Sequence, residues 1–268
     1  MYTLIVLGCA IILPFLLRLF FKKPTGIGNW SEDQAILPYA EIDGTTIAIH
    51  NIRHCKYRAQ KDYDVEHFNR TIHLSGIQTV DFIVEPFRGQ LGVAHTFVSF
   101  GLSDGTYLSI SIEVRKQKGE KYSAWKGLFR NFELMYVIAD ERDVVRLRAN
   151  FRKDDVYLYP IHTTIHNAQK MFLSMIKRMN KLHTHPEFYN TITNTCTTEL
   201  ADHINSITPH RVPYHYRLFI PTLVDRYVYD LGLIDTSEPF EIVKHKALIN
   251  EKAYAAHNSE DYSKKIRS

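Results

Sequence analysis

Cysteine is scarce in this chain of 268 residues, which contains only Cys9, Cys55 and Cys196. Cys9 lies in an apolar N-terminal stretch, so two cysteines remain for the rest of the chain. No disulfide framework can be assigned from so few, and the count leaves the redox compartment open.

Several signatures of common functions are also missing. The chain has no glycine-rich phosphate loop, no Gly-x-Ser-x-Gly elbow and no dense block of Lys and Arg. A net charge of +4 is only mildly basic, which argues against nucleic-acid binding. His162 and His166 lie four residues apart, but the Glu of a His-Glu-x-x-His zinc motif is absent between them. We therefore expect no metal site and no cofactor.

The one long hydrophobic run lies at the N-terminus. Residues 2–21 are nearly all apolar, with Pro14 and Arg18 as interruptions and two lysines directly after them. A helix needs about 20 such residues to cross a bilayer. We predict a transmembrane anchor over residues 1–23, a folded domain over 24–235, and a polar C-terminal helix or tail over 236–268. The lysines after the anchor would by themselves place the folded domain in the cytoplasm.

The first half of the folded domain has the pattern of strands. Alternating apolar and polar residues predict strands over residues 45–49, 79–84, 134–138 and 156–159. Two longer runs flank the turn Ser103-Asp104-Gly105 and predict a hairpin over residues 93–114.

Helical spacing follows later in the chain. Apolar residues three and four apart predict an amphipathic helix over residues 165–179. A second helix is expected from Cys196 to Ile207, ended by Pro209. The aromatic-rich residues 214–233 are interpreted as a helix that packs in the core, with a groove for an acyl chain as the alternative. Strands followed by helices indicate an α+β domain in which an antiparallel sheet packs on helices.

Cys196 stands at the predicted start of the second helix. Asn194 or Thr195 is a good N-cap, which puts Cys196 in the first turn. The free N–H groups and the positive dipole end there stabilise a thiolate and can receive a developing oxyanion. Cys196 is therefore a candidate nucleophile, although a free cysteine is often only a small buried hydrophobic residue.

His95 is the candidate base, because it is a histidine within an otherwise apolar strand. If Leu102 faces Thr106 across the turn, His95 stands opposite Glu113, and residues directly opposite share a face of the sheet. Glu113 would then orient His95, as the third member of a catalytic triad does. The alternative is a satisfied core histidine, with Glu113 paired to Arg115 at the rim.

Several segments resemble one known family. They are Ala94-His-Thr-Phe-Val-Ser-Phe100, Ser111-Ile-Glu-Val-Arg115, Asp140-Glu-Arg-Asp143, Val156-Tyr-Leu-Tyr-Pro160, Phe188-Tyr-Asn190 and Asn194-Thr-Cys-Thr-Thr198. Together they resemble the Lnb N-terminal periplasmic domain family from about residue 30 to 235. The resemblance implies a permuted papain-like (NlpC-like) domain, in which the catalytic His precedes the Cys.

The resemblance also implies site residues. Cys196 would be the nucleophile, His95 the base and Glu113 the orienting group. Asn194, Arg115 and Thr197 would contact the substrate or oxyanion, or support the catalytic residues.

The implied function is that of a membrane-anchored thiol acyltransferase or hydrolase, acting on lipid or lipoprotein acyl groups. The partners would be a membrane lipid or lipoprotein substrate and the bacterial inner membrane, with a single-pass anchor and the folded domain in the periplasm. Two alternatives stay open. One is a cysteine peptidase or amidase acting on cell-wall or protein substrates. The other is a non-catalytic, membrane-tethered binding module.

Overall fold

The computed structural model describes residues 21–89, 92–209, 211–234 and 236–268. The predicted anchor over residues 1–23 lies almost entirely outside the described residues and stays a prediction. Among the described residues, no helix is both long enough and apolar enough to cross a membrane.

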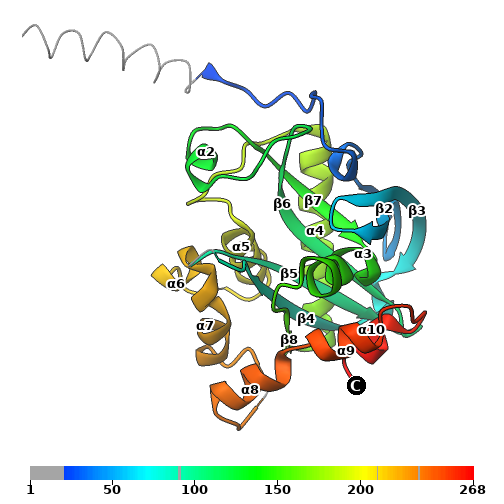
Figure 1. The fold of residues 1–268 in the computed structure, drawn as a ribbon, viewed down its shortest axis with the longest axis vertical. Coiled ribbons are helices and arrows are strands. Elements are labelled where there is room, and N and C mark those ends of the chain that lie inside the picture. Colours follow the sequence, from blue (N-terminus) through cyan, green and yellow to red (C-terminus); the bar gives the residue numbers. More distant parts are fainter. Residues whose placement is uncertain (1–20, 90–91, 210, 235) are drawn as a thin grey trace, which may run out of the picture.

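One large sheet organises the described part of the chain (Figure 1). Its strands are β1 (Tyr39–Asp43), β2 (Thr46–Ala59), β3 (Asp62–His73), β4 (Ile77–Pro86), β5 (Ala94–Leu102), β6 (Tyr107–Arg115), β7 (Glu133–Ala139) and β8 (Tyr157–Pro160). The order is β1-β2-β7-β6-β5-β4-β8, and β3 pairs with β2. Of these pairings, only β2 with β7 is parallel.

Each predicted strand is present, and the α+β class is confirmed. The sequence pattern missed β1 and β3. Most residues of β3 are exposed or only half-buried, so they lack the clear apolar alternation that marks a strand with one buried face.

The β5–β6 hairpin has the predicted register. Leu102 donates its N–H to the carbonyl of Thr106 at 2.9 Å, and Phe97 lies opposite Ser111. Pairing between the two strands stops at this last pair. Beyond it, β5 stays with β4 and β6 stays with β7. The sheet therefore splits between β5 and β6, at the level of His95 and Glu113.

Helices cover both faces of the sheet. They are α2 (Ala124–Leu128), α3 (Glu141–Arg146), α4 (Ile165–Thr184), α5 (Cys196–Ile207), α6 (Tyr216–Phe219), α7 (Val224–Asp230), α8 (Phe240–Ala247), α9 (Asn250–Ala255) and α10 (Tyr262–Lys265), with a π-helical turn η3 (Leu147–Arg152) and 3-10 turns η1 (Glu32–Gln34), η2 (Leu74–Gly76) and η4 (Pro221–Leu223). One core lies under α4 and α5, where Phe100 meets Phe172 at 5.1 Å between ring centroids.

The C-terminal residues, predicted as a polar helix or tail, form the short helices α8, α9 and α10. α9 and α10 pack with α3 on the second face of the sheet (Figure 1). Tyr262 and Ile266 are fully buried there, beside Phe97 of β5 and Val144 of α3. Five apolar side chains spread over residues 249–266 carry this packing, too few for a periodic signal in a charged segment.

The other helices match their predictions unequally. α4 starts at Ile165 as predicted and runs to Thr184, and α5 has both predicted ends. The single helix predicted over residues 214–233 is wrong, because the chain breaks at Pro221 between α6 and α7. Proline lacks the N–H that would continue the helix, and a 3-10 turn forms there instead.

Candidate active site

A hydrogen-bonded cap fixes the start of α5 at Cys196. The Thr195 hydroxyl accepts from the backbone N–H of Thr198 at 3.2 Å, and the Thr198 hydroxyl accepts from the N–H of Thr195 at 2.8 Å. Of the two N-cap candidates, Thr195 takes the role. The reciprocal pair leaves Cys196 in the first turn, where the N–H groups have no partner within the helix.

Asn194 and Thr197 are both engaged with the backbone. Asn194 donates to the carbonyl of Phe188 at 2.8 Å and accepts from the N–H of Asn190 at 2.5 Å, so it closes the loop before α5. Thr197 donates to the carbonyl of Leu218 at 2.5 Å, which ties α5 to α6. Both side chains hold the cysteine-bearing turn in place, and neither lines the cavity that Cys196 borders.

His95 and Glu113 lie on one face of the sheet, but a serine stands between them. His95 Nε2 is 2.7 Å from Ser111 Oγ, which donates to Glu113 Oε1 at 2.9 Å. The direct separation of His95 Nε2 and Glu113 Oε1 is 3.8 Å. His95 and Glu113 are not a strand pair, because pairing stops at Phe97 and Ser111, and Ser111 bridges their side chains instead.

The hydrogen bonds from His95 to Ser111 and from Ser111 to Glu113 assign the tautomer of the His95 imidazole. A carboxylate only accepts hydrogen bonds, so the Ser111 hydroxyl must use its single proton toward Glu113. Ser111 Oγ then accepts from His95, and Nε2 carries the proton. The Nδ1 of His95 keeps its lone pair, and no hydrogen bond to Nδ1 is present within the described part of the chain. Nδ1 is therefore the atom that can accept a proton.

Burial and the nearby charges of Arg148 and Glu113 set the protonation of His95. Arg148 Nη2 lies 3.1 Å from Glu113 Oε1, and Arg148 Nε lies 2.6 Å from Glu85 Oε2. Burial and then the Arg148 charge lower the pKa of His95 to about 3. Burial works against the charged form of Glu113, but Arg148, together with smaller contributions from other nearby cationic groups, holds the pKa of that carboxyl well below its ordinary value. His95 therefore stays neutral at neutral pH, chiefly because it is buried and secondly because of the Arg148 charge.

Cys196 and His95 line the same small cavity, of about 130 Å³, at the split between β5 and β6. Glu113, Tyr122 and Tyr189 also border it. No hydrogen bond joins the thiol and the imidazole among the described residues. Burial raises the pKa of the Cys196 thiol, and the neighbouring Thr96 and the backbone amides at the start of α5 counter that rise only in part. The resting site therefore holds a thiol beside a neutral imidazole.

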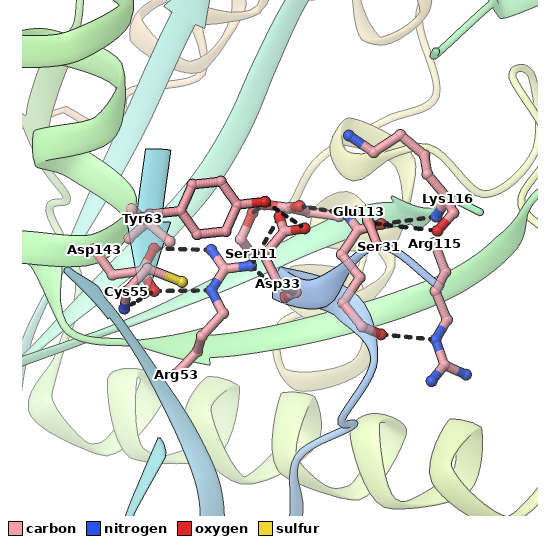
Figure 2. A network of polar contacts seen from close by, with 12 residues as sticks. Ser31, Asp33, Arg53, Cys55, Tyr63, Ser111, Glu113, Arg115, Lys116 and Asp143 are labelled. Carbon is pink, nitrogen blue, oxygen red and sulfur yellow. Dashed lines mark hydrogen bonds and ion pairs between the residues drawn. The ribbon is translucent and has the colours of Figure 1, made fainter. Parts of the chain in front are cut away.

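Cys55, the other cysteine in the folded domain, lies away from this cavity. Asp143 accepts from the Cys55 N–H at 2.9 Å and forms two hydrogen bonds with Arg53, at 2.8 and 2.9 Å (Figure 2). Burial, followed by the charge of Asp143, raises the pKa of the Cys55 thiol well above its ordinary value. Both Cys55 and Cys196 are free, and of the two only Cys196 borders the cavity with His95.

Arg115, at the end of β6, holds the segment that precedes β1 (Figure 2). It donates to the carbonyl of Gln34 at 3.0 Å and to that of Ala35 at 2.8 Å. The Gln34 side chain accepts from the N–H of Lys116 at 2.7 Å and donates to Glu113 Oε2 at 3.4 Å. Arg115 thus supports the site through Gln34 and does not itself border the cavity.

A larger, apolar cavity lies next to the cysteine-bearing turn. It has a volume of about 350 Å³ and is bordered by Thr197, the residue after Cys196. Its apolar lining includes Val80, Phe82, Val98, Leu200, Ala201, Ile204, Leu218 and Val228. Part of this lining comes from α6 and α7, the segment whose aromatic sequence had indicated a groove as the alternative to simple core packing.

Sequence reasoning missed Ser111, Arg148, Glu85 and Gln34. Ser111 was within reach of the register argument, because it lies two residues before Glu113 and so on the same face of β6. The other three come from segments whose position near the hairpin depends on the tertiary structure. No local signal marks them.

Comparison with known families matches residues 63–222 to the Lnb N-terminal periplasmic domain, which is more than half of the chain. The chain belongs to the Lnb N-terminal periplasmic domain family. The resemblance noted in the sequence is thereby confirmed. Membership of this family indicates a periplasmic domain in a membrane context. No curated protein and no solved structure matches the chain. The Lnb match contains Cys196, His95 and Glu113, whereas Gln34 lies before it.

Proposed function

We propose that this chain is a membrane-anchored thiol acyltransferase or hydrolase acting on lipid or lipoprotein acyl groups. Cys196 is the nucleophile and His95 the base. The observation that carries the proposal is the single cavity that both side chains border, at the capped start of α5. A permuted papain-like fold belongs to the same proposal, since the strand with His95 precedes the helix with Cys196.

In the first step, His95 Nδ1 takes the thiol proton and the Cys196 sulfur attacks the carbonyl carbon of an acyl ester. The backbone N–H groups at the start of α5 stabilise the oxyanion of the tetrahedral intermediate. The ester C–O bond breaks, the alcohol leaves with the proton from His95, and a thioester on Cys196 remains.

In the second step, an amine or water attacks the thioester and the C–S bond breaks. His95 moves the proton from the attacking group to the sulfur, which restores the thiol. While His95 is an imidazolium, its Nε2–H donates to Ser111, and Glu113 supplies the opposing negative charge beyond it. This is the role of the orienting carboxylate in a triad, here acting through a hydroxyl group.

The apolar cavity of about 350 Å³ favours a lipid donor over a peptide. A peptidase needs an open polar cleft, whereas an acyl chain needs apolar lining close to the nucleophile. Thr197 borders this cavity and directly follows Cys196, which borders the smaller one, so both cavities meet the first turn of α5.

A second candidate is a membrane-tethered binding module without catalysis. It is favoured by the absence of a thiol–imidazole hydrogen bond among the described residues and by the raised pKa of the Cys196 thiol. In the enzyme hypothesis, bound substrate has to bring the Cys196 thiol and the His95 imidazole into contact. In the binding hypothesis, the thiol and the imidazole do not come into contact.

Intact-protein mass spectrometry after incubation with phospholipid vesicles separates the two. The enzyme predicts an acyl-sized mass gain that hydroxylamine removes, lost in Cys196→Ser and kept in the matched control Cys55→Ser. No adduct together with slow alkylation of Cys196 by iodoacetamide supports the binding module. If no adduct forms but Cys196 is alkylated fast, the thiol is activated, and the enzyme hypothesis should then be tested with peptide substrates.

The apolar cavity has its own test. Ala201 lines it and is buried, so Ala201→Phe would fill part of it. The variant is expected to lose the adduct from long-chain donors while keeping the adduct from an acetyl thioester. The acetyl adduct is the internal control for folding. Retention of both adducts would show that the cavity does not select the donor, whereas loss of both would mean that the variant has lost its fold.

A further inference from the structure

Two segments that border the Cys196 cavity carry exposed apolar side chains: α2 with the residues before it, and the loop before α5. Tyr122 and Tyr189 line the cavity, with their hydroxyl oxygens 3.4 Å apart. Three residues after each of them come Trp125, which is 69% exposed, and Ile192, which is 54% exposed. Large apolar side chains exposed this far indicate an interaction surface when they occur together.

The two segments are joined directly. Thr191, next to Ile192, donates its hydroxyl to the carbonyl of Ala124 at 2.6 Å. Trp125 follows Ala124 in α2. The exposed indole and the exposed Ile192 side chain therefore belong to neighbouring backbone segments, each of which carries a tyrosine that lines the cavity.

The chain enters the folded domain beside the same surface. Lys22 Nζ lies 3.4 Å from Asn131 Oδ1, and Asn131 Nδ2 donates to the carbonyl of Lys126 in α2 at 3.1 Å. Figure 1 shows the first described residues and α2 at the same end of the molecule. The apolar run of residues 2–21 directly precedes Lys22 in sequence. The described residues that directly follow that run in sequence therefore lie close to α2.

The charges around the surface fit anionic headgroups. Lys22 and Lys23 stand at the entry point, and Lys121 and Lys126 flank Trp125 in sequence. Lys126 also pairs with Glu120 at 3.5 Å. Tryptophan with nearby lysines is the combination found where proteins rest at a membrane–water interface.

We infer that the outer side of α2 and of the loop before α5, with Trp125 and Ile192 at its centre, binds the lipid bilayer. It would hold the mouth of the Cys196 cavity at the headgroup region, so that a lipid donor reaches the thiol without leaving the membrane. The surface itself rests on these contacts and exposures, and on the apolar run that precedes Lys22 in sequence. Its role in delivering the substrate rests on the proposed function.

Bromine quenching of tryptophan tests the surface. The full chain contains two tryptophans, Trp30 and Trp125, so Trp30→Phe leaves Trp125 as the reporter and Trp125→Phe leaves Trp30. Each variant is reconstituted into vesicles whose lipids carry bromine near the headgroup end of the acyl chain. We expect strong quenching of Trp125 and little quenching of the partly buried Trp30. Equal quenching of both, or none of Trp125, would overturn the inference and leave a protein partner as the occupant.

A second measurement links the surface to the chemistry. Trp125→Ser with Ile192→Ser removes two anchoring side chains and should slow acylation from bilayer lipid by roughly tenfold. Alkylation of Cys196 by iodoacetamide and acylation by a soluble acetyl thioester should stay unchanged, since neither reagent needs the bilayer. Equal rates from bilayer lipid in the parent and variant would refute the delivery role. If no donor acylates the parent chain, the proposed function fails, and the quenching result alone decides the surface.

Discussion

Arg148 is the side chain whose removal should disturb the site most. It is 4% exposed and pairs with Glu85, which is fully buried, and with Glu113. Arg148→Met keeps most of the volume but leaves Glu85 with only the partly exposed Arg152, at 3.3 Å. Breaking a buried ion pair by removing one partner costs about 3–5 kcal/mol, because the remaining charge has lost its compensation.

The measurement is urea unfolding of the full chain in detergent, followed by tryptophan fluorescence. Arg148→Met should lower the free energy of unfolding by about 3–5 kcal/mol without changing the slope against urea. Adding Glu85→Gln to this variant should recover part of the loss, because it removes the uncompensated charge. Glu85→Gln alone is the matched control, since it leaves Arg148 without its closest partner.

A strong coupling between the two substitutions is the signature of the buried pair. A loss under about 1 kcal/mol for Arg148→Met, or strictly additive effects in the double variant, would refute the reasoning. Such a result would mean that water reaches Glu85 and screens the charge. A second consequence concerns the site itself: without Arg148, the pKa of Glu113 should rise, since that charge is the chief influence holding it down.

Three further predictions concern the supports of the site. Thr195→Ala removes the cap on the Thr198 N–H and should cost about 1 kcal/mol in urea unfolding, whereas Thr195→Ser should keep most of the stability. Burial lowers the pKa of His203 to about 4 from an ordinary 6.5, so the unfolded chain binds a proton that the folded chain does not. The free energy of unfolding should therefore fall by about 3 kcal/mol on account of this histidine as the pH drops from its ordinary pKa to its folded pKa. His203→Gln should make the free energy of unfolding depend less steeply on pH over that range. An unchanged slope would contradict the burial argument. Gln34→Ala leaves the Lys116 N–H without its acceptor and should cost about 1–3 kcal/mol by the same urea assay, and a neutral result would show that water replaces the amide.

The sequence by itself determined the local features of this protein. The start of α5 at Cys196 follows from a cap residue and the helical spacing after it, and its end follows from Pro209. The register of the β5–β6 hairpin follows from a three-residue turn, because strand pairing propagates residue by residue from the turn. The same short segments carry the family motifs. These features depend on residues close together in the chain, where a pattern is enough.

Tertiary structure decided what surrounds those elements. The split between β5 and β6, which makes the cavity, arises because each strand stays with its outer neighbour in the sheet. Arg148 reaches Glu113 from a turn on the second face, and Gln34 arrives from the segment before β1. The packing of Tyr262 into the second core is of the same kind. Each contact joins residues far apart in sequence, and it exists only because the packed sheet and helices bring them together, which no local pattern encodes.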